Sequence, residues 1–235
     1  MQTGRWWTGL CVVALLSAAA VAQETRRPSA SAQKDPQAGD VPAAQAKIGQ
    51  AAPDFTLVDC QGKKHALSDY KDKVLVLEWV NQKCPYSVTA VPFMKDVHKK
   101  YASKGVVWLG VDSSYGRTAA ENATYIKDKE LDFTILMDGD GQVGRTYGAH
   151  NTPQVFIINK GTLVYMGAIH SNQGGAKKGE EVRNYVAEAL DAVLAGKPVP
   201  LAETTPWGCK VAYRSGGDPS AASGVKPVGQ DKKEK

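Results

Sequence analysis

The chain is poor in the residues that most often build metal and redox centres. Its 235 residues include only 4 cysteines, and no two of them form a Cys-x-x-Cys pair. It also has only 4 histidines, and none of them shows the spacing of a metal site. We therefore expect neither a metal centre nor a bound cofactor. The histidines are His65, His98, His150 and His170.

The sequence also lacks long apolar runs and blocks of charge of one sign. The formal net charge is +5, yet Lys and Arg alternate with Asp and Glu along most of the chain, and no basic face carries interleaved aromatic residues. This distribution argues against a nucleic-acid partner. The apolar run at 10–16 is too short to span a bilayer, and no second candidate follows it. We therefore expect no membrane span in the mature chain.

The first 22 residues have the pattern of a secretory signal peptide. Arg5 gives a positive start, the run at 10–16 is apolar, and residues 20–22 form an A-x-A cleavage site. Cleavage near Ala22 predicts a secreted or periplasmic protein, in a compartment where disulfides persist. Cleavage also removes Cys11 and leaves an odd number of cysteines, so at least one thiol is free, transient or intermolecular. The remaining cysteines are Cys60, Cys84 and Cys209.

Composition divides the rest of the chain into four parts. Residues 23–46 are rich in Ala, Gln, Pro and Ser without an apolar period, which predicts a flexible linker. Residues 47–197 carry the apolar patterns of one globular domain. Residues 198–213 form a C-terminal extension with Cys209, and residues 214–235 are expected to be a disordered tail.

The domain is organised around one strand and the turn that follows it. Residues 74–80 are a β-branched and aromatic run, typical of a strand buried on both faces. A helical pattern follows, so Cys84 stands between a central strand and a helix, and Pro85 fits the first helical turn. Unpaired N–H groups at a helix start stabilise a thiolate and lower its pKa. The alternative is a buried cysteine that acts as a small hydrophobic residue.

The remaining patterns alternate between strands and helices, and a strand–helix–strand unit of this spacing implies a parallel crossover. Strands are predicted at 55–57, 65–67, 106–112, 133–137, 154–158 and 163–167, and helices at 118–129 and 180–194.

The order β-β-β-α-β-α-β-α-β-β-α, with a cysteine at the first long strand-to-helix turn, resembles the thioredoxin fold. More narrowly, the chain resembles the redoxin group of alkyl hydroperoxide reductase/thiol-specific antioxidant-like and thioredoxin-like proteins, over about residues 48–196. This implies an α/β fold with a central mixed β-sheet flanked by helices, and flexible segments at both ends. The motifs are APDFTL at 52–57, LSDY at 67–70, VLEW at 76–79, Cys84-Pro85, YGA at 147–149, Thr152-Pro153 and NKG at 159–161.

The resemblance assigns roles to three residues. Cys84 matches the nucleophilic cysteine at the start of the first long helix. Pro153 matches a proline that is cis in thioredoxin-like proteins and faces that cysteine, although an ordinary trans proline is the alternative. Thr152, just before it, would have its backbone free to pair with an extended substrate chain.

Two departures from the family pattern matter. A dithiol oxidoreductase has a second cysteine three residues after the first, but this chain has Ser87 there. A peroxiredoxin has Thr or Ser three residues before its reactive cysteine to orient peroxide, and this chain has Asn81, whose amide could still form a hydrogen bond. Arg117 and Arg145 are candidates for the cation near Cys84 only through their loops, and surface charges are the alternative.

The resemblance leaves the roles of two further residues open. Glu78 interrupts the central strand; it is either a buried proton acceptor behind the nucleophile or a strand-end carboxylate paired with a lysine. Cys209 is either a distal resolving cysteine that pairs with Cys84 or a structural partner of Cys60, which lies in a predicted turn. The apolar residues near Cys209 indicate that the extension packs back onto the domain: Trp207 and Val211.

The chemistry expected is attack by the Cys84 thiolate on a protein disulfide, with Cys209 as the possible resolving residue and an external thiol as reductant. Two alternatives remain. In one, the protein is a thiol peroxidase that reduces peroxides at Cys84. In the other, it is a redox-inactive module that binds an extended peptide at Thr152 and Pro153. The sequence does not set the oligomeric state.

Overall fold

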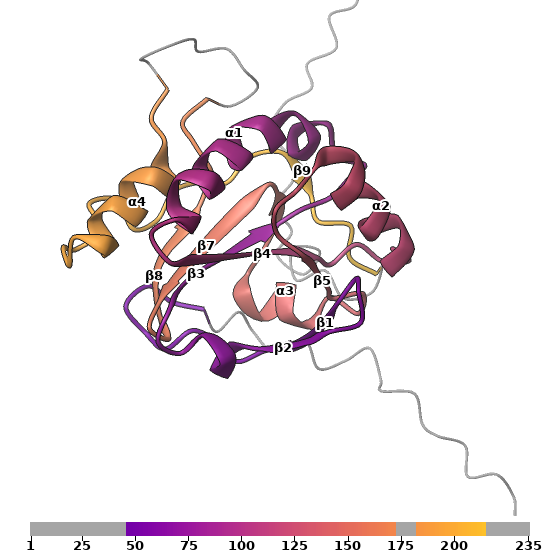
Figure 1. Ribbon diagram of the computed structural model, residues 1–235, viewed down its shortest axis with the longest axis horizontal. Helices are drawn as coiled ribbons and strands as arrows, with labels where there is room; N and C mark the ends of the chain where they lie inside the picture. Colours follow the sequence, from indigo (N-terminus) through magenta and orange to yellow (C-terminus); the bar gives the residue numbers. More distant parts are fainter. Residues whose placement is uncertain (1–45, 173–181, 215–235) are drawn as a thin grey trace, which may run out of the picture. The chain divides into compact units, whose positions relative to one another are not determined.

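The computed structural model of the protein describes residues 46–172 and 182–214 (Figure 1). The predicted signal peptide, the predicted linker apart from Ala46, and the predicted tail apart from Arg214 lie outside these residues. Within the two ranges, no helix combines the length and the apolar content that crossing a membrane requires.

A mixed β-sheet forms the centre of the described residues, in the strand order β2-β1-β5-β4-β3-β7-β8. The central strand β3 pairs in parallel with β4 and antiparallel with β7, as the predicted fold class requires. The strands of this sheet are β1 (Thr56–Asp59), β2 (Lys64–Ala66), β3 (Val74–Trp79), β4 (Val106–Asp112), β5 (Ile135–Met137), β7 (Gln154–Asn159) and β8 (Thr162–Gly167).

Helices cover both faces of this sheet (Figure 1). The side chains of β3 alternate: Leu77 and Trp79 enter the cluster that also contains Tyr147, whereas Val76 enters the cluster with Met94 and other residues of α1. Because apolar side chains leave β3 on both faces, this strand is buried throughout. The helices are a short 3-10 helix η1 (Leu67–Tyr70), α1 (Pro85–Ala102), α2 (Ala119–Lys129), α3 (Gln142–Tyr147) and α4 (Tyr185–Leu194).

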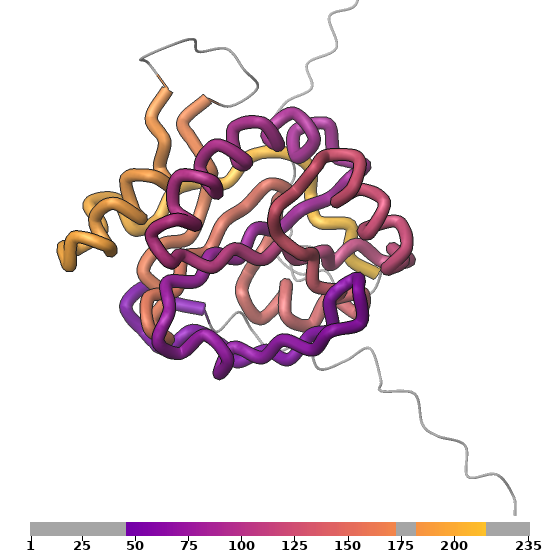
Figure 2. The backbone as a smooth tube through the Cα atoms, viewed as in Figure 1, coloured from indigo at the N-terminus to yellow at the C-terminus, as the bar shows by residue number. Residues whose placement is uncertain are grey.

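The C-terminal extension packs back onto the domain, as predicted. Two short strands, β6 (Asn151–Thr152) and β9 (Cys209–Lys210), pair antiparallel and join the extension to the loop before β7. The Trp207 Nε1–H donates to the carbonyl of His170 at 3.0 Å, and Val211 is buried in the core. In Figure 2 the yellow end of the tube passes close to the beginning of α1, which β9 contacts.

The last helix begins later than predicted. The pattern predicted a helix over 180–194, but α4 starts at Tyr185, because the Asn184 side chain accepts a hydrogen bond from Ala187 N at 2.9 Å and caps the helix. Residues 180 and 181 lie outside the described residues. The pair β6–β9 was not predicted, because a strand of two residues is too short to show an alternation of apolar and polar residues.

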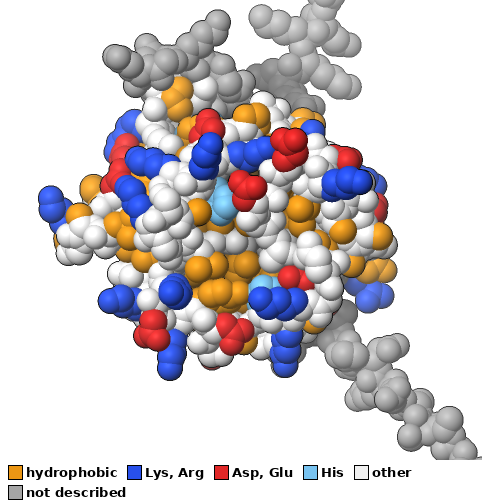
Figure 3. Space-filling view, viewed as in Figure 1, with side chains coloured by type: hydrophobic (Ala, Val, Ile, Leu, Met, Phe, Trp, Pro, Cys, Tyr) orange, Lys and Arg blue, Asp and Glu red, His pale blue; other side chains and the backbone are white. Residues whose placement is uncertain are grey.

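The charges on the surface are mixed, as the sequence indicated. On the face shown in Figure 3, Lys and Arg side chains alternate with Asp and Glu around a group of hydrophobic side chains near the centre. This face therefore presents no continuous basic surface.

Candidate active site

Cys84 is the N-cap residue of α1, and its backbone is extended there. Its carbonyl accepts the first helical hydrogen bond, from Val88 N at 3.0 Å, and Pro85 follows in the first turn. The Cys84 side chain is only 1% exposed, and its Sγ–H donates to the carbonyl oxygen of Thr152 at 3.1 Å. Cys84 therefore lies between a central strand and a helix, as predicted.

Asn81 and Ser87 hold the turn that leads into Cys84. The Asn81 side-chain oxygen accepts from Lys83 N at 2.8 Å, and its backbone carbonyl accepts from Cys84 N at 3.0 Å. Ser87 Oγ in turn accepts from Asn81 N at 3.2 Å. Both polar residues shape the loop through backbone contacts, and the peroxide-orienting role of Asn81 stays a prediction.

The second thiol at the site comes from the C-terminal extension. Cys209 lies opposite Thr152 in the β6–β9 pair, and the Thr152 carbonyl accepts from Cys84 Sγ at 3.1 Å, so both cysteines meet at Thr152. Cys60 instead contacts the Thr134 hydroxyl at 4.0 Å and is buried in its turn, with 9% of its surface exposed. Of the two pairings left open by the sequence, the structure brings together Cys84 and Cys209, as free thiols.

The environment separates the acidities of the two thiols. Burial raises the pKa of Cys84, but hydrogen bonds from the side chains of Cys209 and Thr152 and from backbone N–H groups outweigh it, so this pKa is lowered. Burial and the neighbouring Cys84 raise the pKa of Cys209 to about 11. Because a thiolate is the nucleophile in disulfide chemistry, Cys84 is the better attacking group.

Thr152 and Pro153 face Cys84 from β6. The peptide bond between them is cis, as the resemblance implied. The Thr152 hydroxyl is buried and has no hydrogen-bond partner within the described part of the chain, yet its side chain contributes to the lowered pKa of Cys84. We therefore expect this hydroxyl to donate to the Cys84 sulfur when Cys84 is a thiolate.

Thr152→Val should therefore raise the pKa of Cys84, because valine keeps the shape of threonine but cannot donate. We expect the rate at which iodoacetamide alkylates Cys84 at neutral pH to fall severalfold, and its pH profile to move to higher pH. Mass mapping of the alkylated peptide measures this at Cys84 alone. Thr134→Val, beside Cys60, is the matched control, and an equal effect of both changes would contradict the assignment.

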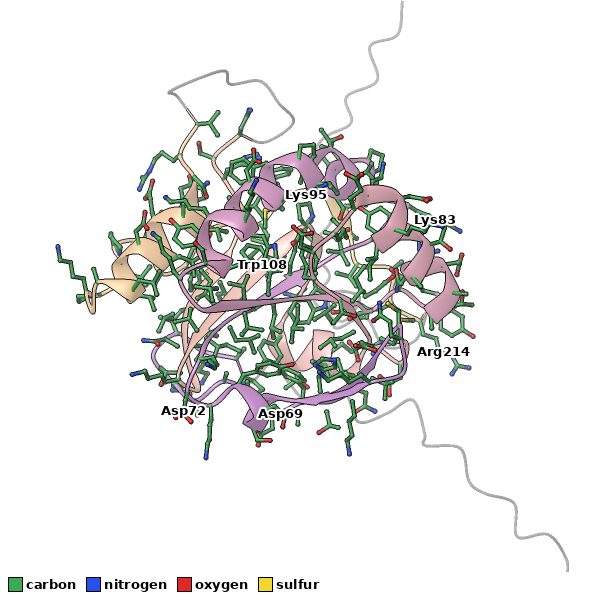
Figure 4. The ribbon with its side chains drawn as sticks, in the orientation of Figure 1. Asp69, Asp72, Lys83, Lys95, Trp108 and Arg214 are labelled. Atoms are coloured by element: carbon green, nitrogen blue, oxygen red, sulfur yellow. The ribbon has the colours of Figure 1, made fainter. Side chains whose placement is uncertain are left out.

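Glu78 lies in β3 on the side of the sheet that α1 covers. Its carboxylate accepts a hydrogen bond from Trp108 Nε1 at 3.0 Å, and Figure 4 shows Trp108 on that side. Glu78 is 4% exposed, and burial raises its pKa to about 7 against the effect of the Trp108 hydrogen bond. No ion pair within the described residues includes Glu78, so the lysine-paired alternative is wrong.

A small cavity connects Glu78 with the beginning of α1. Its volume is about 10 Å³, which is roughly the room that one water molecule needs. Ser87 lines the cavity, and its backbone N–H is one of the groups that lower the pKa of Cys84. The other lining residues are Val80, Val91, Met94, Tyr125, Leu131 and Phe133.

The two candidate arginines are held by polar contacts with residues other than Cys84. Arg117 pairs with Asp112 at 3.4 Å and with Glu121 at 2.9 Å, and Arg145 donates to the carbonyl of Asp140 at 2.7 Å. Both arginines contribute to ordered polar contacts, so the surface-charge alternative is wrong for both.

Sequence reasoning missed an aromatic group at the edge of the site. Tyr86 is 44% exposed beside Cys84, and its ring lies 6.1 Å from that of Trp207. The Trp207 ring lies 4.9 Å from that of His170, which contacts Phe93 at 4.7 Å. The Trp-Gly-Cys sequence of the extension was the available signal, because an aromatic residue beside a cysteine in a short tail needs a surface to pack on.

Comparison with known proteins agrees with this geometry. The model of the AhpC/TSA family matches residues 48–166. The chain belongs to the AhpC/TSA family. This confirms the resemblance, and Cys209 lies beyond the region that the family model covers.

This AhpC/TSA-family chain is similar to curated proteins named thiol-disulfide oxidoreductase ResA. The protein from Bacillus thuringiensis subsp. konkukian (strain 97-27) is 29% identical over 147 residues, which cover 63% of this chain and 79% of that protein. The protein from Bacillus subtilis (strain 168) is 32% identical over 111 residues, covering 47% and 61%.

Solved structures show the fold of this AhpC/TSA-family chain. A hypothetical protein from Sinorhizobium meliloti 1021 matches with a TM-score of 0.67 and 26% identity, over 75% of this chain and 100% of that one. An uncharacterized conserved protein from Geobacillus kaustophilus matches with a TM-score of 0.66 and 24% identity, over 72% and 93%. The fold is therefore thioredoxin-like, with a mixed sheet and flanking helices, as predicted.

Proposed function

We propose that this protein is a thiol-disulfide oxidoreductase in which Cys84 attacks the substrate and Cys209 resolves the intermediate. The observation that carries the proposal is that Thr152 holds both cysteines: its carbonyl accepts from Cys84 Sγ, and its backbone pairs with Cys209 in the β6–β9 pair. The similarity to proteins named thiol-disulfide oxidoreductase ResA supports the same reaction class. Cys209 thus supplies the second thiol that Ser87 does not provide.

The reaction proceeds in two exchanges. The Cys84 thiolate attacks one sulfur of a substrate disulfide, the substrate S–S bond breaks, and the released thiolate takes a proton. Cys209 then loses its proton and attacks the Cys84 sulfur, which releases the second substrate thiolate and forms the Cys84–Cys209 disulfide. Two electrons have moved from the protein to the substrate, and an external dithiol returns them.

Glu78 is the group we assign to accept a proton in this cycle. Its pKa of about 7 lets it exchange a proton near neutral pH, which a carboxylate of ordinary pKa does poorly. The cavity that it shares with Ser87 leads from Glu78 toward the thiols, because Ser87 lies in the first turn of the helix that Cys84 caps. Glu78 acts at a distance, as a proton acceptor for the thiol pair.

The test compares two oxidants on the fully reduced protein. We expect the reduced protein to speed the reduction of insulin by dithiothreitol, and to end as the Cys84–Cys209 disulfide when it reacts with insulin alone. Hydrogen peroxide should oxidise Cys84 no faster than it oxidises a free thiol. Rapid peroxide consumption, with a sulfenic acid trapped on Cys84 in Cys209→Ser, would identify the peroxidase alternative. Peptide binding that Cys84→Ser leaves unchanged, without any turnover, would identify the redox-inactive module.

We also propose a secreted or periplasmic location. The support is the signal-like pattern of residues 1–22 and the use of a disulfide cycle. Sequencing the N-terminus of the protein purified from its native host should find a chain that begins near Gln23, and a chain that retains residues 1–22 would contradict this.

A further inference from the structure

The segment that carries Cys209 also covers Cys84. We define residues 206–213 as the C-terminal strap. Cys84 is 1% exposed although it stands at a helix start, and β9 of the strap contacts α1 there. A large molecule therefore cannot reach the Cys84 sulfur while the strap is in place.

The strap occupies a strand edge that a polypeptide could otherwise use. Its backbone pairs antiparallel with β6, Thr152 opposite Cys209 and Asn151 opposite Lys210. The Asn151 side-chain Nδ2 adds a hydrogen bond to the carbonyl of Gly208 at 3.0 Å. Extended peptides commonly bind by adding a strand to such an edge, and here a segment of the same chain already does so.

The strap is held by contacts at its two ends. At one end, the Trp207 indole packs on His170 and Tyr86. At the other end, the Tyr213 hydroxyl donates to the carbonyl of Ala149 at 2.8 Å, and Val211 is buried in the core. Two further backbone hydrogen bonds join the strap to the domain, from Val211 N to the carbonyl of His150 at 2.9 Å and from Tyr115 N to that of Ala212 at 2.8 Å. A terminal segment with a two-residue ladder and few buried side chains can still open locally.

Gly208 is the point where the strap lies nearest to β6. A Cβ atom at Gly208 would lie 2.2 Å from the carbonyl oxygen of Thr152, which is backbone and cannot turn away. The φ angle of Gly208 is +114°, a conformation that other residues adopt only with strain. Glycine is thus required before the cysteine for the strap to seat on β6.

We propose that the strap is a self-docked strand that excludes polypeptide substrates from β6, so that protein disulfides reach Cys84 only after the strap is released. The inference rests on the proposed function, since it concerns which disulfides gain access. The strap also carries the resolving thiol, so its return brings Cys209 to the Cys84–substrate disulfide and competes with the substrate for β6. Resolution and product release then occur in one movement.

The test measures the access to Cys84 in the full chain with a large and a small thiol reagent. In a Cys209→Ser background, Cys84 is alkylated with iodoacetamide or with a maleimide attached to a long polyethylene glycol chain, and each rate is read by peptide mapping. Adding Gly208→Ala should raise the ratio of the large-reagent rate to the small-reagent rate by about tenfold or more, because strain at this position favours release of the strap. An unchanged ratio would overturn the proposal.

Two further variants serve as a matched control and as a second test of the strap. Gly62→Ala is the matched control, because Gly62 also has a positive φ, +90°, but a Cβ atom there meets nothing within 4 Å. It should leave the ratio unchanged. Asn151→Ala removes only the side-chain hydrogen bond to Gly208, so it should raise the ratio of the two alkylation rates less than Gly208→Ala does. If Gly208→Ala fails to fold, Asn151→Ala replaces it as the test variant. Equal ratios in Asn151→Ala and the control would count against the strap.

The result that would overturn the proposed function differs from the result that would overturn the strap. With dithiothreitol as the source of electrons, we compare the rates at which insulin and a small disulfide, oxidised glutathione, are reduced. Gly208→Ala with Cys209 intact should raise the ratio of the insulin rate to the glutathione rate above that of the unmodified protein. A shifted alkylation ratio without reduction of either disulfide by any variant would overturn the proposed function and leave the strap as a cover over Cys84. If the unmodified protein reduces disulfides and every variant shows the same preference between insulin and the small disulfide, the proposal for the strap alone would be overturned.

Discussion

Cys84→Ser should reduce disulfide turnover by more than about a thousandfold, because a serine hydroxyl is not ionised near neutral pH and cannot form a disulfide. The expectation follows from the lowered pKa of Cys84 and from its place at the start of α1. The measurement is the initial rate of insulin reduction with dithiothreitol as the source of electrons.

Two other cysteine variants show whether the loss is specific. Cys60→Ser should leave turnover within about twofold, because Cys60 contacts Thr134 and lies apart from the thiol pair. Cys209→Ser should stop after the first exchange and accumulate a mixed disulfide between the substrate and Cys84. Equal turnover in Cys84→Ser and in the unmodified protein would contradict the assignment of the nucleophile.

Glu78→Gln should change how stability depends on pH. Burial raises the pKa of Glu78 from 4.5 to about 7, so the folded protein keeps this proton at pH values where the unfolded chain has released it. The unfolded state then binds fewer protons, and the free energy of unfolding falls as the pH rises from about 4.5 to about 7. The stability is fully present below the lower pKa, and the loss across this window is about 3 kcal/mol.

Glutamine has no proton to release, so the Glu78→Gln variant should lack this component. Denaturant unfolding at several pH values should show the unmodified protein losing about 3 kcal/mol relative to the variant between pH values of about 4 and about 8. Glu130→Gln is the control, because Glu130 forms only an exposed ion pair with Lys95 and should give parallel curves. Parallel curves for Glu78→Gln would show that the Glu78 pKa is not raised.

The sheet and its helices could be predicted because their signals are local. The strand around Leu77 is apolar on both faces, and the expected strand at 106–112 has the observed bounds of β4. The place of Cys84 followed from the change of pattern at the end of β3, and the position of Pro153 followed from the family motif. These elements need no knowledge of distant contacts.

The rest of the site depends on contacts between distant parts of the chain. The pairing of Cys209 with Thr152 rests on a ladder of two residues, which leaves no periodic trace in the sequence. The partner of Glu78 is Trp108 on the neighbouring strand, and only the strand register brings the two together. The sequence therefore identified the candidate cysteines, but it did not show whether Cys60 or Cys84 is the partner of Cys209.

Cys84 and Cys209 are proposed to form one redox pair. The most direct measurement is peptide mapping of the oxidised protein, with free thiols alkylated before and after mild reduction. We expect a disulfide between Cys84 and Cys209 that dithiothreitol opens readily, with Cys60 free throughout. A stable disulfide between Cys60 and Cys209, with Cys84 alkylated before reduction, would contradict it.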